Sequence, residues 1–173
     1  MKYWALKTRE DRNPRHSAEH WEDFLAERLI AIGWEKIGVS PDRASLDEIA
    51  AAIKKAYGGT NKAATTNANT IQKFVSISPR DKVLICQGYA PNQHKKVHLY
   101  GIATVIGLFE DHDSKRWQWR FRHKAKIEPF GTNGKDVLKE FLVRRLGKGS
   151  LLQTLHEISK EGFGRVVEDI VKR

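Results

Sequence analysis

The chain has 173 residues, enough to form one domain around a hydrophobic core without disulfides or metals. Its 31 Lys and Arg residues against 21 Asp and Glu give a formal net charge of +10, which favours a polyanionic partner because cations placed on phosphates release counterions. The single cysteine, Cys86, excludes a disulfide framework and a thiolate metal site. No segment matches a signal peptide or a membrane span, so we expect a cytoplasmic protein with no membrane partner.

The first half of the chain alternates short apolar runs with amphipathic stretches. The clearest helix start is the capping box at residues 45–48, in which Ser45 and Glu48 can satisfy each other's backbone N–H groups. The expected elements are a strand over residues 3–7, a helix from Ser17, a strand over residues 29–33, a helix from the capping box to Gly58-Gly59, and a helix from Thr66 or Asn67 to Phe74.

The second half begins with three consecutive strands, predicted over residues 82–87, 97–106 and 117–127. Gly101, inside the second of these strands, indicates a bulge or a close approach of two backbones. The acidic residues of the following turn, Glu110 and Asp111 among them, are interpreted as turn formers. After Pro129 the composition changes, and the expected helices cover residues 136–145, 151–160 and 164–173.

This order of elements indicates the fold class. A doubly wound parallel sheet would alternate strands and helices to its end, whereas this chain has a run of strands flanked by helices. The sequence therefore predicts a mixed α/β fold with a small twisted sheet or barrel and helices around it.

One predicted strand combines aromatic and basic side chains. In residues 117–127 the aromatic residues alternate with cations, so one face can stack on bases while the other follows a phosphate backbone. Both sets also have an ordinary interpretation, because a strand tryptophan commonly fills the core and cations commonly form a solvated face. The cations expected to contact phosphate are Lys7, Arg12, Lys95, Lys96, Lys115, Arg116, Arg120, Arg122 and Lys124.

Residues that could perform catalysis are sparse. The seven histidines show no metal-ligand spacing, and the chain has neither a phosphate-cradling glycine loop nor a nucleophile elbow. We therefore expect no metal, no cofactor and no catalytic activity in this chain. A cryptic metal-dependent nuclease remains as an alternative.

Several segments resemble a known family. MKYWALK at residues 1–7 is similar to the opening strand of EVE and YTH domains, which belong to the PUA-like superfamily. LIAIGW at residues 29–34, followed by IGV at 37–39, resembles EVE-like domains of modification-dependent restriction proteins of the Mrr and McrB type. In the family's order there follow NTIQKF at 69–74, RDKVLI at 80–85 and YGIATVIG at 100–107.

The resemblance implies a PUA-like barrel flanked by helices, with an aromatic cage that takes a modified base. It covers residues 1–130 as a base-recognition domain and leaves residues 131–173 as a helical extension packed on it. The implied cage residues are Trp34 after the second strand and Trp117 or Trp119 before the last core strand.

The resemblance also implies polar groups that read the edge of the base. Thr8 and Arg9 occupy these positions, although the family often has Ser or Asn where this chain has Thr-Arg-Glu-Asp. Tyr89 completes the expected site, in a loop over residues 88–96 that is longer than expected and could contact DNA.

These expectations describe a reader of modified nucleic acid. The base, expected to be methylated and in double-stranded DNA, would be flipped out of its stack into the cage. The chain would then be the specificity module of a modification-dependent restriction system, with a nuclease or motor in another domain or chain. A PUA-like RNA-binding protein is the alternative.

Overall fold

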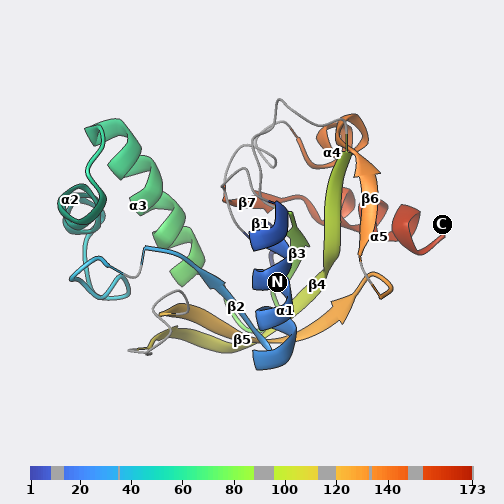
Figure 1. The fold of residues 1–173 in the computed structure, drawn as a ribbon, viewed down its shortest axis with the longest axis horizontal. Helices are drawn as coiled ribbons and strands as arrows, with labels where there is room; N and C mark the ends of the chain where they lie inside the picture. Colours follow the sequence, from blue (N-terminus) through green and yellow to red (C-terminus); the bar gives the residue numbers. More distant parts are fainter. Residues whose placement is uncertain are drawn as a thin grey trace.

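The computed structural model describes residues 1–8, 14–34, 36–87, 96–112, 120–132, 134–147 and 154–172, without the side chains of residues 14–17. Its elements, shown in Figure 1, are β1 (Tyr3–Lys7), α1 (Pro14–Glu27), β2 (Leu29–Ile32), α2 (Leu46–Tyr57), α3 (Asn61–Val75), β3 (Lys82–Cys86), β4 (Lys96–Asp111), β5 (Phe121–Pro129), β6 (Lys135–Leu138), α4 (Lys139–Leu146), β7 (Leu155–Ile158) and α5 (Lys160–Val171).

The described strands form one mixed, curled sheet. Its order is β2-β5-β4-β3-β1-β7, and β6 pairs with β4 outside this path. The β1–β3 pair is parallel and the other pairs are antiparallel. The ladder between β4 and β5 is irregular between Val105 and Phe109, and such irregularities bend and twist a strand. The predicted mixed α/β class, with a twisted PUA-like sheet flanked by helices, is confirmed.

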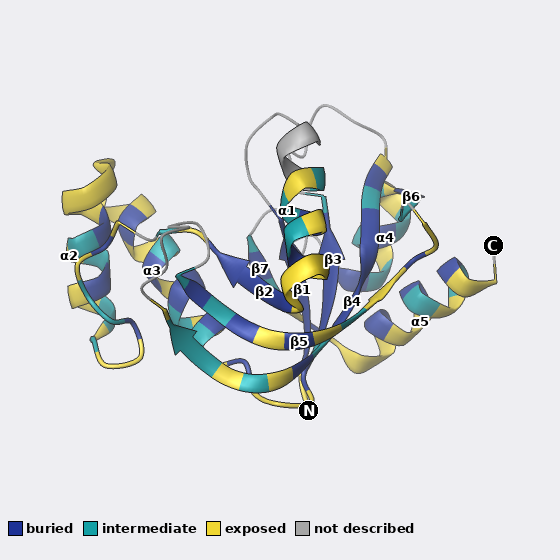
Figure 2. Cartoon of the chain, turned by 60° about the horizontal axis from the view of Figure 1, so that its bottom comes forward, coloured by how far each residue is buried: buried dark blue, intermediate teal, exposed yellow. Residues whose placement is uncertain are grey.

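The two faces of the sheet carry separate cores, because successive strand residues point to opposite sides. Trp4 and Leu6 of β1 belong to the core that includes α1, α2 and α3. Tyr3 and Ala5 belong to the second core, which includes α4 and α5. Figure 2 shows that buried residues follow β1 and β3 through the centre of the sheet, while the outer faces of the helices are exposed. Both faces of the central strands are therefore covered.

A buried carboxylate fastens the start of β1 to the start of β3. Asp81 is 3% exposed and accepts hydrogen bonds from Lys2 N at 2.6 Å, Trp4 Nε1 at 3.3 Å and Ser78 N at 3.1 Å. Three donors compensate for the loss of water around this group. Trp4 is therefore a core residue of the first strand.

The helix starts follow local capping chemistry. The predicted capping box is present: Glu48 N donates to Ser45 Oγ, and Ser45 N donates to Glu48 Oε2. The predicted start of α3 at residue 66 or 67 is too late, because Thr60 caps the helix by accepting from Ala63 N. Likewise α1 begins at Pro14 rather than at Ser17, and proline is well suited to a first helical turn because it lacks the N–H that would go unpaired there.

The C-terminal part of the chain corrects two expectations of helix. Residues 155–158, expected to be helical, form β7 and pair antiparallel with β1. Residues 135–138, expected to lie largely in a helix, form β6 and pair with the start of β4. Both strands meet partners far away in the sequence, so local periodicity could not reveal them. The segment 131–173 therefore adds two strands to the sheet as well as α4 and α5.

The prediction for Gly101 is confirmed. A Cβ atom there would lie 2.5 Å from Glu128 O and 2.9 Å from Trp21 Cη2, so only glycine allows β5 and α1 to approach this closely. The register between β3 and β4 also shifts beside it, at Ile85 and Cys86. Among the described residues, no helix combines the length and the hydropathy needed to span a membrane.

Candidate functional site

The predicted site residues lie at opposite ends of β4. Thr8 N donates to Cys86 O, and Cys86 is paired with Leu99 near the start of β4. Trp34 lies two residues after Ile32, the last residue of β2. Ile32 is paired with Phe121 of β5, and Phe121 is paired with Asp111 at the end of β4. Twelve residues of the irregular strand β4 lie between these two levels. Figure 1 shows β2 running away from β1 towards α2 and α3. Thr8 and Trp34 therefore follow strands that are three strands apart in the sheet order.

We call the first end the β1 rim; it is defined by Thr8, His20, Trp21, His98 and Tyr100. Thr8 is 8% exposed, and its Oγ1 atom is buried with no hydrogen-bond partner among the described residues. Leaving a buried hydroxyl unpaired costs about 1–3 kcal/mol. His20 Nδ1 lies 2.9 Å from Thr8 O, so the Thr8 carbonyl has a partner while its hydroxyl has none among the described residues.

Aromatic side chains lie on the α1 side of the sheet, where Trp21 and Tyr100 are buried in the core. Trp21 of α1 stacks on Tyr100 of β4, with 5.3 Å between ring centroids and 18° between planes. His98 meets the edge of Tyr100 at 4.8 Å, and its Nδ1 atom lies 2.8 Å from Asp136 Oδ1. Burial raises the pKa of Tyr100 to about 12, so its phenol stays neutral. The β1 rim thus combines apolar rings with hydroxyl and imidazole groups.

The cations expected at the β1 rim differ in exposure. Lys7 is 8% exposed, and Lys96 is exposed. Burial raises the pKa of the neighbouring Cys86 thiol to about 12 although the Lys7 charge opposes it, so Cys86 stays protonated. Four further predicted site residues belong to the loops after β1 and before β4 and lie outside the described residues: Arg9, Arg12, Tyr89 and Lys95.

We call the second end the hairpin rim; it is defined by Trp34, Asp111 and Arg120. Trp34 has φ 69°, a left-handed conformation that is strained for a bulky residue, and its side chain is partly buried against the core. Trp34 O accepts a hydrogen bond from Ile37 N. The other predicted residues of this part of the sequence, Lys115, Arg116, Trp117 and Trp119, lie outside the described residues.

Arg120 is held by protein acceptors. Nε and Nη2 donate to Asp111 at 2.6 and 3.1 Å, and Nη1 donates to Ile37 O at 2.6 Å. Nη2 also lies 3.3 Å from Val39 O, while Ser40 Oγ donates to the same carboxylate. Burial raises the pKa of Asp111, but hydrogen bonds from Arg120 and Ser40 outweigh burial and hold the pKa below its usual value.

The two other described cations of this strand face Glu110. Arg122 Nε donates to Glu110 Oε2 at 2.9 Å, and Lys124 Nζ lies 3.6 Å from Glu110 Oε1. The interpretation of Glu110 and Asp111 as turn formers is wrong, because both lie in β4; Glu110 pairs with cations of β5, and Asp111 pairs with Arg120 immediately before β5. Of the three cations, Lys124 has the most exposed side chain, at 65%.

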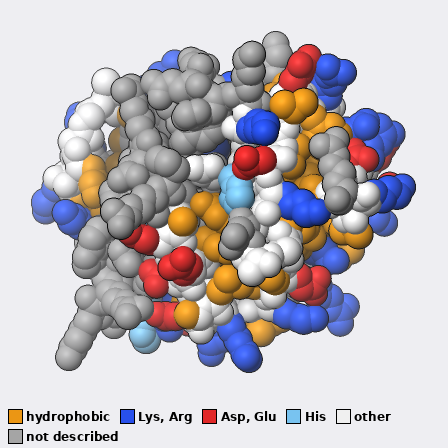
Figure 3. All heavy atoms as spheres, turned by 45° about the vertical axis from the view of Figure 1, so that its right-hand side comes forward, with side chains coloured by type: hydrophobic (Ala, Val, Ile, Leu, Met, Phe, Trp, Pro, Cys, Tyr) orange, Lys and Arg blue, Asp and Glu red, His pale blue; other side chains and the backbone are white. Residues whose placement is uncertain are grey.

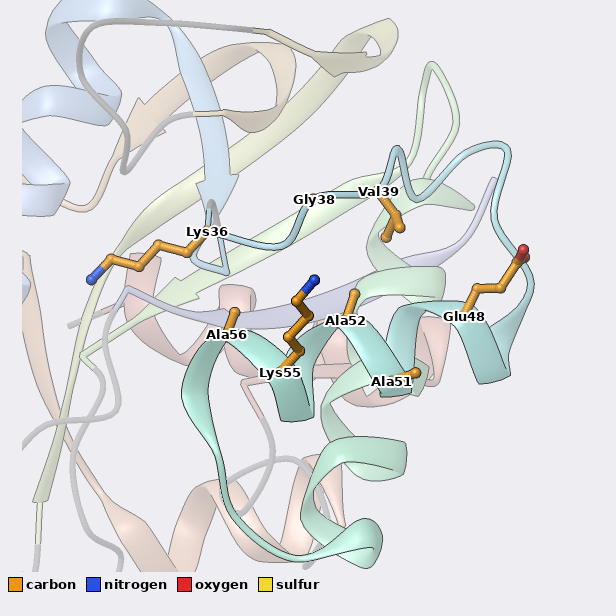
Figure 4. A pocket seen from close by; sticks show the side chains of 8 residues that line it. All are labelled: Lys36, Gly38, Val39, Glu48, Ala51, Ala52, Lys55 and Ala56. Atoms are coloured by element: carbon orange, nitrogen blue, oxygen red, sulfur yellow. The ribbon is translucent and has the colours of Figure 1, made fainter.

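A groove beside the hairpin rim was missed by sequence reasoning. It has a volume of about 610 Å³ and lies between α2 and residues 36–39 (Figure 4). Its α2 wall carries Ala51, Ala52 and Ala56 together with Lys55 and Glu48. The only feature of the sequence that could have indicated this groove is the set of alanines in α2, because short side chains leave space beside a helix.

The surface charge is dispersed on the face drawn in Figure 3. A histidine there lies beside an acidic side chain, hydrophobic side chains lie to its left and further below, and Lys and Arg side chains lie mostly towards the periphery. Within the described ranges, no group of three or more His, Cys, Asp or Glu side chains could hold a metal ion.

No protein-family model and no curated protein sequence matches this chain. Solved structures do match in fold. The chain is similar to protein Atu2648 from Agrobacterium tumefaciens (TM-score 0.51, 14% identity, 98% of this chain and 93% of the other) and to a hypothetical protein from Leishmania major (0.50, 13%, 99% and 96%). It is also similar to the YTH domain of Mmi1 in a crystal structure with RNA (0.50, 11%, 99% and 78%). The fold is therefore YTH-like.

Proposed function

We propose that this chain is a nucleic-acid-binding reader that holds a modified base at the β1 rim. The observation that carries the proposal is the Thr8 hydroxyl, which is buried and has no hydrogen-bond partner among the described residues. A ligand that bonds this hydroxyl recovers the cost of leaving it unpaired. The net charge of +10 and the similarity in fold to a YTH domain that binds RNA both support a polyanionic ligand.

The recognition would combine apolar and polar contacts. A methyl group adds apolar surface to a base, and burial of that surface against apolar side chains favours it by about 1–2 kcal/mol. The Thr8 hydroxyl can donate to or accept from the base edge, which distinguishes bases with the same methyl group. No catalytic step is assigned to this chain.

The finer proposal is that the base is flipped out of double-stranded DNA, at a cost of a few kcal/mol. The role of specificity module in a modification-dependent restriction system rests on the sequence resemblance, and it requires a nuclease or motor in another domain or chain. A modified base in RNA is the second candidate, and the RNA bound by the Mmi1 domain favours it.

The test is a binding comparison between single-stranded RNA and duplex DNA. Each is offered unmodified, with N6-methyladenine, with 5-methylcytosine and with 5-hydroxymethylcytosine. We expect one modification to bind more tightly, and we expect Thr8→Val to reduce that preference about tenfold while leaving the salt dependence of binding unchanged. Thr70→Val is the matched control, because its hydroxyl is bonded to Thr66 O inside α3.

The variant Trp34→Ala distinguishes a base site at the β1 rim from a base site at the hairpin rim. If the β1 rim holds the base, this variant keeps the preference for the modified ligand. Loss of the preference in Trp34→Ala, with Thr8→Val unaffected, would move the site to the hairpin rim and overturn the assignment to Thr8. Equal affinity for all modified and unmodified ligands would overturn the reader proposal itself.

A further inference from the structure

The groove between α2 and residues 36–39 is independent of the proposed base site. Its volume of about 610 Å³ falls within the range of ligand-binding pockets in proteins. The floor is built from short apolar side chains, those of Ala51, Ala52 and Ala56 on α2 and Val39 on the opposite segment. A cavity of this kind accepts an aliphatic side chain. None of the described residues that line it is aromatic; Tyr57, which is 44% exposed, lies at its Lys36 end.

The segment opposite α2 is held in place by the rest of the fold. Arg120 donates to the carbonyl groups of Ile37 and Val39, on either side of Gly38, and the Asp111 carboxylate fixes its guanidinium. At the start of the segment, Lys36 N donates to Tyr57 Oη at the end of α2. The groove is thus a preformed feature whose two walls are connected at several points, which lowers the entropy cost of filling it.

The charged side chains differ between the two ends of the groove. In Figure 4, Lys55 extends from α2 towards the opposite segment, Lys36 lies at the same end with its side chain directed away from α2, and Glu48 lies at the other end. Neither lysine has an ion pair in the part of the chain that the structure describes. Glu48 instead accepts hydrogen bonds from Ser45 in the capping box. The groove therefore offers two available cations at one end and a fixed carboxylate at the other.

We propose that this groove docks an acidic peptide segment of a partner protein, with an aliphatic side chain in the groove and carboxylates at Lys36 and Lys55. The apolar floor selects the aliphatic group, and the two lysines select the acidic neighbours. Glu48 repels a continuous polyanion laid along the groove, which favours a peptide over a nucleic-acid strand. Its position also sets the direction of the peptide. The partner would then bind at the opposite end of β4 from the β1 rim.

The test is a titration of the ¹⁵N-labelled full chain followed by amide chemical shifts. The probe is the acetylated hexapeptide EDLEDL, and the comparison peptides are EDSEDS and KKLKKL. We expect EDLEDL to shift the amides of Gly38, Val39 and Ala52, and we expect neither comparison peptide to do so. Lys55→Glu should weaken the binding of EDLEDL by about tenfold or more.

Three further variants complete the test, and two of them lie outside α2. Lys36→Glu lies outside the helix and should weaken binding as Lys55→Glu does, and Ala51→Gln should block the groove without adding charge. Lys62→Glu, the same charge reversal on the exposed surface of α3, should leave binding unchanged.

The proposal is overturned if EDLEDL shifts other amides or none, or if EDSEDS binds equally well. It is also overturned if a short oligodeoxythymidylate shifts Gly38 and Val39 in a way that Lys55→Glu abolishes, because the groove then belongs to nucleic acid. None of these outcomes depends on whether Thr8 contacts a base.

Discussion

Arg120 and Asp111 form a two-point ion pair at the end of the β4–β5 hairpin, with Nε–Oδ1 and Nη2–Oδ2 distances of 2.6 and 3.1 Å. Their side chains are 23% and 17% exposed, and Arg120 Nη1 also donates to the backbone of Ile37. A guanidinium with this many protein acceptors has little capacity left for a phosphate. Its position identifies it as a residue that supports the loop after β2.

Arg120→Ala should therefore lower the free energy of unfolding by about 2 kcal/mol, because it leaves Asp111 partly buried without its main partner. Chemical denaturation measures this change. We expect the salt dependence of nucleic-acid binding to stay the same. The matched control is Lys124→Ala, which removes an exposed cation and should cost less than about 0.5 kcal/mol. A stable Arg120→Ala protein with a smaller salt slope would identify Arg120 as a phosphate ligand after all.

His123 should make stability depend on pH in the weakly acidic range. Its side chain is fully buried, with Nε2 2.8 Å from Phe74 O, and burial lowers its pKa more than the nearby carbonyl and carboxylate groups raise it. Because the folded pKa lies below the unfolded value of about 6.5, the unfolded chain binds more protons between the two values. The free energy of unfolding should therefore fall as the pH drops below about 6.5.

Urea unfolding at about pH 7.5 and about pH 5.5 measures this dependence. His123→Gln should reduce the difference between the two conditions, even if the variant is less stable at both. His156 also has a pKa lowered mainly by burial, but it is more exposed, so His156→Gln should change the difference less. An identical pH dependence in the His123→Gln protein would contradict the assignment.

Gly101→Ala should destabilise the protein by about 2–3 kcal/mol, because the new methyl group meets the backbone of Glu128 at 2.5 Å and cannot displace it easily. Thermal unfolding followed by circular dichroism measures the change. Gly107→Ala in the same strand is the control, since its nearest contact is Lys124 Cβ at 3.1 Å and a smaller shift relieves it. Equal losses in the two variants would show that the close approach of β4 and β5 is not the limiting feature.

Thr8→Val should leave the unliganded protein as stable as the original or about 1 kcal/mol more stable, because it removes a buried hydroxyl that has no partner in the described part of the chain. Thr70→Val should instead lose about 1 kcal/mol, since that hydroxyl bonds Thr66 O at 3.2 Å. Differential scanning calorimetry on both variants gives the comparison. A clear destabilisation by Thr8→Val would mean that the hydroxyl already has a partner in the unliganded protein.

The features that the sequence predicted correctly depend on neighbours along the chain. The capping box of Ser45 and Glu48 acts within one helical turn, and the apolar runs of β1, β2 and β3 identify strands wherever their partners lie. Gly101 predicted a close approach of two backbones, because a glycine inside a strand often marks a bulge or such an approach. Its contact with Glu128 nevertheless joins residues that are far apart in the sequence.

Tertiary structure alone decided what the charges do and which site residues meet. Glu110 and Asp111 were assigned to a turn, yet β4 continues through them; Glu110 pairs with Arg122 of β5, and Asp111 pairs with Arg120 immediately before β5. Thr8 and Trp34 were predicted to belong to one cage, and the strand order shows that β1 and β2, which lead to them, are three strands apart in the sheet. Strand order and register are set by contacts between distant segments, and residue type and spacing do not contain that information. The sequence by itself determined a basic mixed α/β domain and its strands β1 to β5, but not β6 and β7, and the long-range pairing of β4 decided which of its side chains remain available to a ligand.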